Sequence, residues 1–228
     1  MSGHQLDGAV VAVVGASGAL GSRIARGAAE RGATVVLVGR DAERLGEVVD
    51  GASVVVGDLG DATLGDRLLE TATDAHGGLD GVVNAAGVAA FGDLVDTDDA
   101  VIEELFLTNV VGPLFLARRV LPALAERRGF LVNLSAVLAE QPMAGMAAYS
   151  ASKAALTAAD RALTKELRRR HVDVVDVRPP HTETGLVDRG LAGTAPRLPE
   201  GLDPDVVARA VLDAVEQGRP ELASDDIG

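Results

Sequence analysis

Short runs of apolar, often β-branched residues alternate along the chain with longer segments whose apolar residues recur at helical spacing. The short runs are apolar throughout, which is typical of strands buried on both faces of a parallel sheet. They predict strands over residues 9–14, 34–39, 53–57, 79–84, 130–135 and 172–178. The longer segments predict two helices that end near residues 31 and 48, and four more over about 62–76, 98–126, 147–170 and 204–218. A short last strand is predicted within residues 220–224.

This alternation predicts an α/β fold, a doubly wound parallel sheet with right-handed crossovers. We expect one Rossmann-like, three-layer α/β/α domain over residues 1–228, without a linker or repeat. Asp41 and Asp203 are predicted N-cap residues, and Pro113 predicts a bend or break in the long helix. The only long irregular stretch, 179–202, is rich in Pro, Gly and Thr, and we interpret it as a substrate loop.

Composition narrows the class of protein. Hydrophobic residues make up 47% of the chain and aromatic residues only 2%, so the core has to be built from Val, Leu and Ala. There is no Cys, and the four His are scattered, so no metal site is predicted. The formal charge of −13 argues against nucleic acid or an anionic membrane as a partner. No signal pattern and no apolar run of about 20 residues is evident, so we expect a cytoplasmic protein.

Three glycines, Gly15, Gly18 and Gly21, lie between the first predicted strand and the first helix. In this position Gly15 permits a tight turn, Gly18 lets the backbone approach a pyrophosphate, and Gly21 allows close packing of helix on strand. The phosphates would then lie at the amino end of the helix. The spacing alone is weak, but its place after the first strand of an alternating chain predicts a dinucleotide site.

The end of the second predicted strand is expected to contact the adenosine ribose. An acidic residue there favours a free 2′-hydroxyl, whereas Arg accommodates a 2′-phosphate. The chain has Gly39-Arg40 at this point, which favours NADP(H) over NAD(H). The alternative is that Arg40 only pairs with a neighbour such as Asp41 or Glu43.

Tyr149 is the only tyrosine, and Lys153 is one of only two lysines. At a spacing of four they share one face of the predicted helix, so a phenol and an ammonium lie together. Bringing the phenol pKa from about 10 to near 7 takes roughly 4 kcal/mol, and a cation about 4 Å away at an effective dielectric of about 20 supplies that much. We therefore expect Lys153 and an oxidised nicotinamide together to suffice. Taken alone, the pair is common in helices, and a half-buried Tyr beside a solvated Lys is the alternative.

Several motifs occur in one order and spacing along nearly the whole chain. They are Gly15 to Gly21, Asp58-Leu59, Asn84-Ala85-Ala86-Gly87, Asn109, Asn133-Leu134-Ser135, and Tyr149 with Lys153. In this combination the chain resembles the short-chain dehydrogenase/reductase family. The resemblance implies an oxidoreductase that interconverts a ketone or aldehyde and an alcohol with a nicotinamide cofactor.

The resemblance also implies roles for individual residues. Tyr149 is expected to be the general acid–base, Lys153 to bind the nicotinamide ribose and lower the pKa of Tyr149, and Asn109 to anchor a water of a proton relay. Ser135 is the candidate for the catalytic Ser. With Arg40, the expected cofactor-binding residues are Gly15, Ser17, Gly18, Leu20, Gly21, Asp58, Leu59, Asn84, Ala85, Ala86, Gly87, Tyr149, Lys153, Pro179, Thr182 and Thr184.

The catalytic Ser of the family usually lies thirteen residues before the Tyr, and that position is Ala136. Ser135 is one residue earlier, and neighbouring side chains of an extended segment point to opposite sides. Ser135 therefore replaces the missing hydroxyl only if the loop carries a one-residue shift. Losing one such donor typically costs about 10²–10³ in rate. The alternative function is thus a cofactor-binding regulatory or scaffold protein with weak or no turnover.

Other expectations concern partners. By resemblance we expect a homodimer or homotetramer that acts on a small molecule. The small residues Ala151, Ala155, Ala158 and Ala159 would let another helix approach, although they could equally pack within one subunit. His181, Glu140 and Gln141 lie in loops expected to border the pocket, where they serve polar substrates or are simply solvated.

Overall fold

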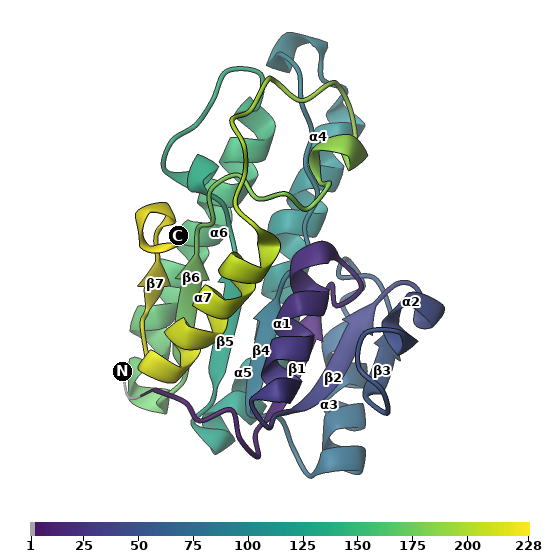
Figure 1. The fold of residues 1–228 in the computed structure, drawn as a ribbon, viewed down its shortest axis with the longest axis vertical. Helices are drawn as coiled ribbons and strands as arrows, with labels where there is room; N and C mark the ends of the chain where they lie inside the picture. The colour runs from purple at the N-terminus through teal and green to yellow at the C-terminus, as the bar shows by residue number, and fades with distance from the viewer. Residues whose placement is uncertain (1–2) are drawn as a thin grey trace.

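A seven-stranded parallel sheet forms the centre of the computed structural model, which describes residues 3–228 (Figure 1). The strand order is β3-β2-β1-β4-β5-β6-β7, so the chain winds outward in both directions from β1 and β4. The strands are β1 (Val10–Val14), β2 (Thr34–Gly39), β3 (Ser53–Val56), β4 (Gly81–Asn84), β5 (Phe130–Leu134), β6 (Asp173–Val177) and β7 (Glu221–Leu222). The predicted single-domain, doubly wound fold is confirmed.

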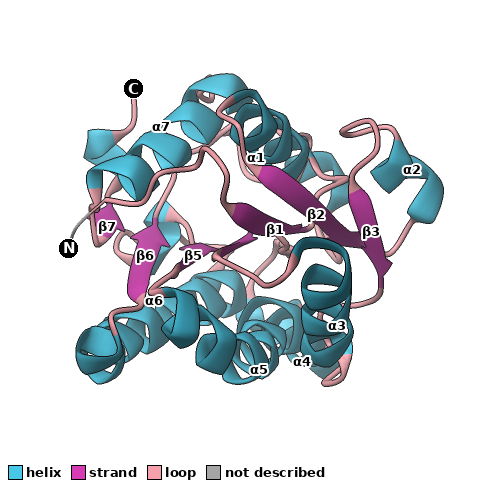
Figure 2. Ribbon diagram, turned by 90° about the horizontal axis from the view of Figure 1, so that it is seen from below, coloured by secondary structure: helices cyan, strands magenta, loops and turns pink. Residues whose placement is uncertain are grey.

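Helices cover both faces of the sheet, with α1 and α7 on one side and α3, α4, α5 and α6 on the other (Figure 2). The α-helices are α1 (Ala19–Glu30), α2 (Ala42–Gly46), α3 (Leu64–His76), α4 (Asp99–Phe106), α5 (Gly112–Arg127), α6 (Ala147–Leu167) and α7 (Pro204–Gln217). The predicted caps form, because the side chain of Asp41 accepts from the Arg44 backbone and that of Asp203 from the Asp205 backbone.

Alternate residues of the strands pack into two separate hydrophobic cores, one on each face of the sheet. In β1, Val11 and Val13 pack with α1 and α7, whereas Val10, Ala12 and Val14 pack with α3 and α5. All five residues are buried, as expected for a central strand that is covered on both sides. The continuous apolar runs of the sequence are the direct consequence of this double coverage.

The long helix predicted over 98–126 is divided in two. Residues Leu107–Val111 form a π-helical turn between α4 and α5, and the Gly112 N–H donates to the Leu107 carbonyl five residues back. Pro113 explains the break, because it has no N–H for the bond to the Asn109 carbonyl that a regular helix would make. The break predicted from Pro113 therefore occurs at Asn109, one of the predicted site residues.

Other boundaries differ slightly from those predicted. Helix α2 ends at Gly46, so Val48 lies beyond it, and α3 begins at Leu64. Helix α6 ends at Leu167, followed by a 3₁₀ turn to Arg170. These changes leave the predicted order of elements intact.

One helical stretch among the described residues, Asp99–Arg127, is long and apolar enough to cross a membrane by length and composition, with a mean hydropathy of 1.6 over an 18-residue window. Helices in the core of a soluble protein meet the same criterion. Here Leu116, Val120 and Leu124 of the stretch are buried in a core cluster of the sheet. Its length and composition therefore do not by themselves indicate a span.

Candidate active site

The segment from Gly15 to Gly18 joins β1 to α1 as predicted, and Gly21 lies in the first turn of α1. Gly15 has a φ of +76°, and a Cβ there would lie 2.8 Å from the Ala86 nitrogen. A Cβ at Gly21 would lie 2.2 Å from the Gly15 carbonyl, whereas one at Gly18 would meet only that carbonyl, at 3.1 Å. Gly15 and Gly21 are thus required by backbone packing, while Gly18 leaves open space beside the loop.

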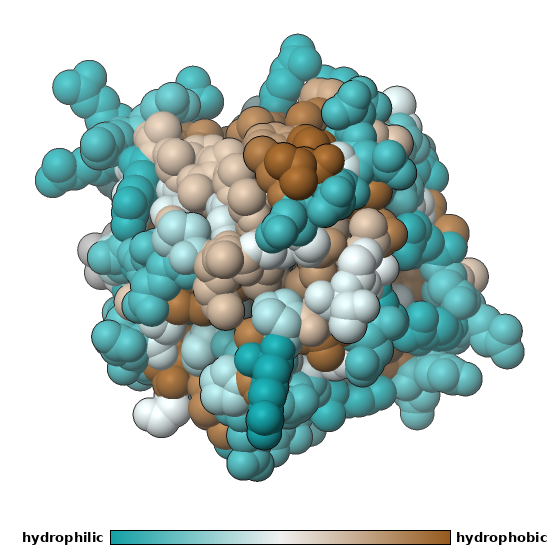
Figure 3. Space-filling model, turned by 90° about the horizontal axis from the view of Figure 1, so that it is seen from above, coloured by the Kyte–Doolittle hydropathy of each residue, from teal (hydrophilic) through white to brown (hydrophobic). Residues whose placement is uncertain are grey.

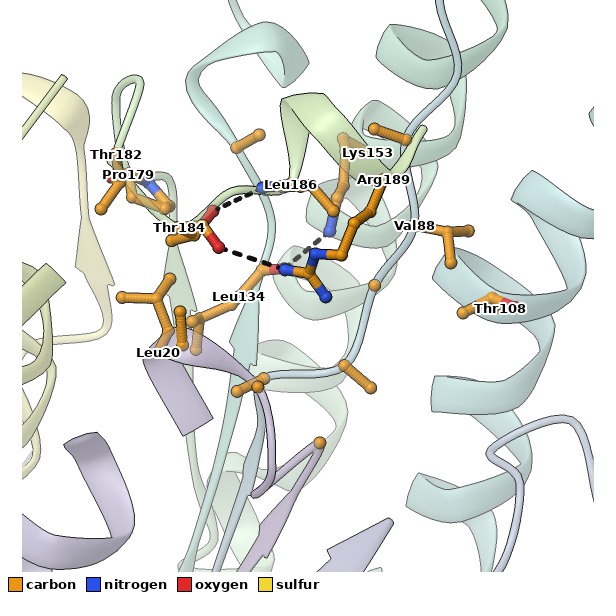
Figure 4. Close-up of a pocket in the computed structure, with 18 of the residues that line it drawn as sticks. Leu20, Val88, Thr108, Leu134, Lys153, Pro179, Thr182, Thr184, Leu186 and Arg189 are labelled. Carbon is orange, nitrogen blue, oxygen red and sulfur yellow. Dashed lines mark hydrogen bonds between the residues drawn. The ribbon is translucent and has the colours of Figure 1, made fainter. Parts of the chain in front are cut away.

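A cavity of about 480 Å³ opens at the carboxyl ends of the strands, where this loop lies. Among the predicted site residues, those that line it are Gly15, Ser17, Gly18, Leu20, Arg40, Asp58, Leu59, Ala85, Ala86, Gly87, Ser135, Tyr149, Lys153, Pro179, Thr182 and Thr184. Figure 4 shows several of them around one space. Residues far apart in the sequence are therefore brought together as the parallel fold requires, because all the strands end at this edge.

Three predicted residues, Gly21, Asn84 and Asn109, lie behind the cavity wall. Asn84 donates to Asn133 Oδ1 at 3.1 Å and braces the sheet. The Asn109 amide accepts from the Val88 N–H at 3.0 Å and donates to the Val88 carbonyl at 2.9 Å. In this structure the side chain of Asn109 thus holds the wall segment after β4.

Tyr149 and Lys153 lie on the same buried face of α6 and both line the cavity. The Lys153 Nζ is 6.0 Å from the centre of the Tyr149 ring and donates to the Leu134 carbonyl at 2.9 Å. The phenol packs beside Phe91, Leu105 and Met146. The predicted pair is therefore buried rather than solvated.

Burial acts on both groups in the same direction, toward their neutral forms. It raises the pKa of Tyr149 to about 12. It lowers the pKa of Lys153 to about 8, against the opposing effect of the carboxylates of Asp176 and Asp160. Desolvation is thus an effect on Tyr149 that opposes the lowering of its pKa expected from Lys153.

Ser135 and Ala136 point to different surroundings. The Ser135 hydroxyl donates to the Lys153 carbonyl at 3.0 Å, and Thr157 Oγ1 lies 2.9 Å from Ser135 Oγ. Ala136 also lines the cavity. The hydroxyl of Ser135 is therefore engaged with helix α6, behind the site, as the alternation of an extended segment predicts.

Sequence reasoning missed several residues of the cavity. Its apolar part is lined by Val88, Ala89, Phe91, Leu138, Met143, Met146, Leu186 and Val187. Apolar side chains also gather in the middle of the face seen from above, with hydrophilic side chains around them (Figure 3). These residues come from loops and short 3₁₀ turns, which carry no periodic signal that could have marked them.

Two further arginines line the cavity, Arg44 and Arg189. Arg44 donates to the Ser17 carbonyl at 2.9 Å, beside the glycine loop. The sequence alone did not mark Arg44, because its contact with the glycine loop joins residues 27 positions apart. Arg40 pairs with Asp58, at 3.8 Å, and not with the neighbours proposed for it.

Of the three loop residues expected to border the pocket, one lines the cavity and two do not. His181 lines the cavity, with its Nε2 3.3 Å from Glu183. Glu140 instead pairs with Arg178, at 3.1 Å, and neither it nor Gln141 lines the cavity. Within residues 3–228, no group of three His, Cys, Asp or Glu side chains could hold a metal ion.

Comparison with known proteins identifies the family. The family model described as short chain dehydrogenase matches residues 9–192. The chain belongs to the short-chain dehydrogenase/reductase family. It is 33% identical to an uncharacterized oxidoreductase of Staphylococcus aureus (strain USA300) over 91% of each protein. It is 31% identical to the dehydrogenase/reductase SDR family member 7B of Xenopus laevis over 97% of this chain and 75% of that protein.

Solved structures agree with this family. A short-chain dehydrogenase from Burkholderia cenocepacia J2315, in complex with NADP, superposes with a TM-score of 0.86 at 27% identity, over 97% of this chain and 90% of that one. A short-chain dehydrogenase from Streptomyces avermitilis gives a TM-score of 0.84 at 30% identity, over 94% and 88%. The family is one of oxidoreductases that use nicotinamide cofactors.

In this family member a buried polar network lies behind α6. Asn133 donates to Asp160 Oδ1 at 2.7 Å, whereas Asp160 Oδ2 is buried without a hydrogen-bond partner. Thr157 Oγ1 lies 3.2 Å from Asp176 Oδ1, and Asp176 pairs with the buried Arg178. Burial raises the pKa of Asp160 to about 8; the Asn133 hydrogen bond lowers this pKa and the charge of Asp176 raises it.

We predict that Asp160→Asn stabilises the protein at pH 8 by about 1–3 kcal/mol. Folded Asp160 holds a proton up to a pKa of about 8, whereas the unfolded carboxyl releases it near 3.8. The native state thus binds more protons between these values, so this carboxyl lowers the free energy of unfolding as pH rises from about 4 to 8. Urea denaturation at pH 5, 6.5 and 8 measures the effect.

The stabilising effect of Asp160→Asn is expected to shrink toward pH 5. Asp74→Asn is the matched control, because Asp74 is an exposed carboxylate on α3. A variant at Asp160 that is less stable than the wild type by the same amount at every pH would contradict the prediction.

Proposed function

We propose that the protein is an NADP(H)-dependent oxidoreductase that interconverts a ketone or aldehyde and an alcohol. The observation that carries the proposal is the position of Tyr149 and Lys153, which lie buried in the wall of the cavity that the glycine loop also lines. A proton donor and a cofactor-binding loop therefore face the same space. Family membership supports the same reaction class.

The residues at the glycine loop fit the diphosphate of a nicotinamide cofactor. The amino end of α1 has no side-chain cap and no acidic residue in its first turn. Its free N–H groups and the positive end of the helix dipole are therefore available to an anion. Gly18 leaves room beside them, because a side chain there would extend into the open space.

In the proposed reaction, Tyr149 protonates the substrate oxygen during reduction and accepts its proton during oxidation. When bound, the nicotinamide supplies or receives the hydride at the carbonyl carbon. A raised pKa keeps Tyr149 protonated in the free protein, which suits a general acid. Lys153, fixed by the Leu134 carbonyl, stabilises the phenolate that forms after proton transfer.

With Ala136 at this position, the site has one hydrogen-bond donor fewer for the substrate oxygen than a site with Ser would have. Ala136 lines the cavity without a hydroxyl, and the Ser135 hydroxyl is bonded to Lys153. This observation is the one that favours the alternative of a cofactor-binding protein with little turnover. The proposal therefore predicts a slow enzyme that a single hydroxyl improves.

We expect Ala136→Ser to raise kcat for NADPH-dependent carbonyl reduction by about 10²-fold, because it adds a donor to the developing oxyanion. The affinity for NADPH should stay unchanged, since the new hydroxyl faces the substrate. Turnover of a panel of ketones and aldehydes, followed by NADPH absorbance, measures the effect.

Tyr149→Phe in the Ala136→Ser background is the control, and it should abolish turnover while NADPH still binds. Saturable NADPH binding without oxidation in both the wild type and Ala136→Ser would favour the non-catalytic alternative. Loss of turnover in Ser135→Ala, with NADPH affinity retained, would show that Ser135 is the catalytic hydroxyl.

A preference for NADP(H) is supported by two arginines, Arg40 directly after β2 and Arg44 in the following helix α2. Arg40 has its side chain 78% exposed and is held only by a long contact to Asp58. Arg44 is directed to the glycine loop by its bond to the Ser17 carbonyl. Both line the cavity, so both are available to a 2′-phosphate.

We predict that Arg44→Ala weakens NADPH binding about tenfold and leaves NADH binding unchanged, because a charge-assisted contact to the 2′-phosphate is lost. Fluorescence titration with each cofactor measures both dissociation constants. Arg26→Ala is the matched control, because Arg26 of α1 bonds the Val48 carbonyl and does not line the cavity. Equal weakening of NADPH and NADH would contradict the assignment.

We also propose a homo-oligomer, supported by apolar side chains exposed beside the π-helical turn. Leu107, Leu114 and Phe115 are 39%, 40% and 36% exposed. They recur at spacings of seven and eight, and therefore lie on one face of the helix. On α6, Ala151 and Ala158 are exposed as well, so close approach of another helix is open there.

Phe115→Arg is expected to reduce the particle mass toward that of a 23.3 kDa single chain, because a charge is introduced into an apolar contact. Light scattering after size-exclusion chromatography measures the mass. Val95→Arg is the control, since Val95 is 91% exposed and lies on the separate turn Leu94–Asp96. A wild type with the mass of one chain would refute the oligomer.

A further inference from the structure

Arg189 lies at the end of a short 3₁₀ turn, Val187–Arg189, within the predicted substrate loop. Its Nε donates to the Gly185 carbonyl at 3.1 Å, and its Nη2 donates to the Thr184 carbonyl at 3.1 Å. Two hydrogen bonds from different nitrogens fix the plane of the guanidinium. Three of the five N–H groups of an Arg remain free for a ligand.

No carboxylate within residues 3–228 neutralises Arg189, which forms no ion pair there. This is notable in a chain with 34 acidic and 21 basic residues. A guanidinium that is held by carbonyl groups, lines a cavity and lacks a counter-ion is suited to bind an anion.

The direction of the side chain indicates which part of the cavity it serves. Figure 4 shows Arg189 extending from the loop toward the side where Thr184, Leu20 and Leu134 lie, with Val88 and Thr108 on the other side. Leu20 belongs to the first turn of α1, next to the glycine loop. Arg189, the Thr184 residue that binds it and the glycine loop all line the same cavity, so an anion at the amino end of α1 shares that cavity with the guanidinium.

We infer that Arg189 binds the diphosphate of the nicotinamide cofactor, as an anion-binding residue contributed by the substrate loop. The inference rests on the proposed cofactor site and adds a residue to it. The diphosphate would be bound from two sides, by neutral N–H groups of α1 and by the cation of Arg189. Arg40, directly after β2, and Arg44, in α2, are the residues proposed for the 2′-phosphate.

A carboxylate on the substrate would satisfy the same chemistry. The apolar side chains of Phe91, Leu138 and Met146 make the substrate part of the cavity a poor place for an anion. The two sources differ in what Arg189→Ala changes. Loss of a diphosphate contact weakens the cofactor, and loss of a carboxylate contact raises KM for acidic substrates only.

The experiment measures the dissociation constants of three ligands for the wild type and the Arg189→Ala variant by isothermal titration calorimetry. NADPH and 2′-phospho-ADP-ribose contain the diphosphate, whereas adenosine 2′-monophosphate lacks it. Arg197→Ala is the matched control, because Arg197 lies in the same loop and does not line the cavity. Arg189→Lys tests whether charge without the planar fork is sufficient.

We expect Arg189→Ala to weaken NADPH and 2′-phospho-ADP-ribose by about tenfold or more, and Arg189→Lys to restore part of the loss. Adenosine 2′-monophosphate should bind Arg189→Ala as it binds the wild type, and Arg197→Ala should leave all three affinities unchanged. The dependence of NADPH affinity on NaCl concentration should also become less steep in Arg189→Ala.

Unchanged affinities in Arg189→Ala would overturn the inference while leaving the cofactor site intact. A rise in KM confined to carboxylate-bearing carbonyl compounds would assign Arg189 to the substrate instead. A wild type that binds neither NADPH nor NADH would refute the proposed function itself, and the inference with it.

Discussion

Parallel hydrogen bonding of β1 to strands on both sides is the constraint on which the rest of the molecule depends. Val11 pairs in register with Val35 of β2 and with Gly81 of β4, so the sheet is extended in two directions from its first strand. Parallel strands all end at one edge, and each crossover has to return over a face of the sheet. The loops at the carboxyl ends are therefore gathered around one cavity, and the helices bury both faces.

The same burial sets the electrostatics of the site. Tyr149 and Lys153 stand on a helix whose inner face is closed by the sheet, so neither group is well hydrated. Desolvation pushes both toward the neutral state. The Asp176 carboxylate opposes this effect on Lys153, and Asp160 adds to it only where it ionises, above a pKa of about 8. The polar network behind α6 thus acts on a lysine whose charge the proposed chemistry requires.

The difference between Ser135 and Ala136 follows from strand geometry. Both residues come directly after β5, and the extended backbone sends their side chains to opposite sides. One hydroxyl is held by α6, and the cavity receives a methyl group. A one-residue difference along an extended segment therefore places the two side chains in different environments.

Local signals in the sequence were sufficient for the strands, the caps at Asp41 and Asp203, the break at Pro113 and the glycine loop. Each depends on neighbouring residues, through the period of apolar positions, side-chain capping or a positive φ. The family motifs then located part of the cavity wall, including Tyr149 and Lys153.

Tertiary structure alone decided the roles that depend on distant partners. Arg189 and Arg44 line the cavity, and each is held there by a hydrogen bond to a backbone carbonyl. Glu140 does not line the cavity and pairs with Arg178 instead. Burial, which the sequence does not state, sets the pKa of Tyr149 and leaves Asp160 Oδ2 unpaired. Local patterns specify the conformation of a segment, whereas desolvation and ion pairing arise only after segments distant in the sequence have packed together.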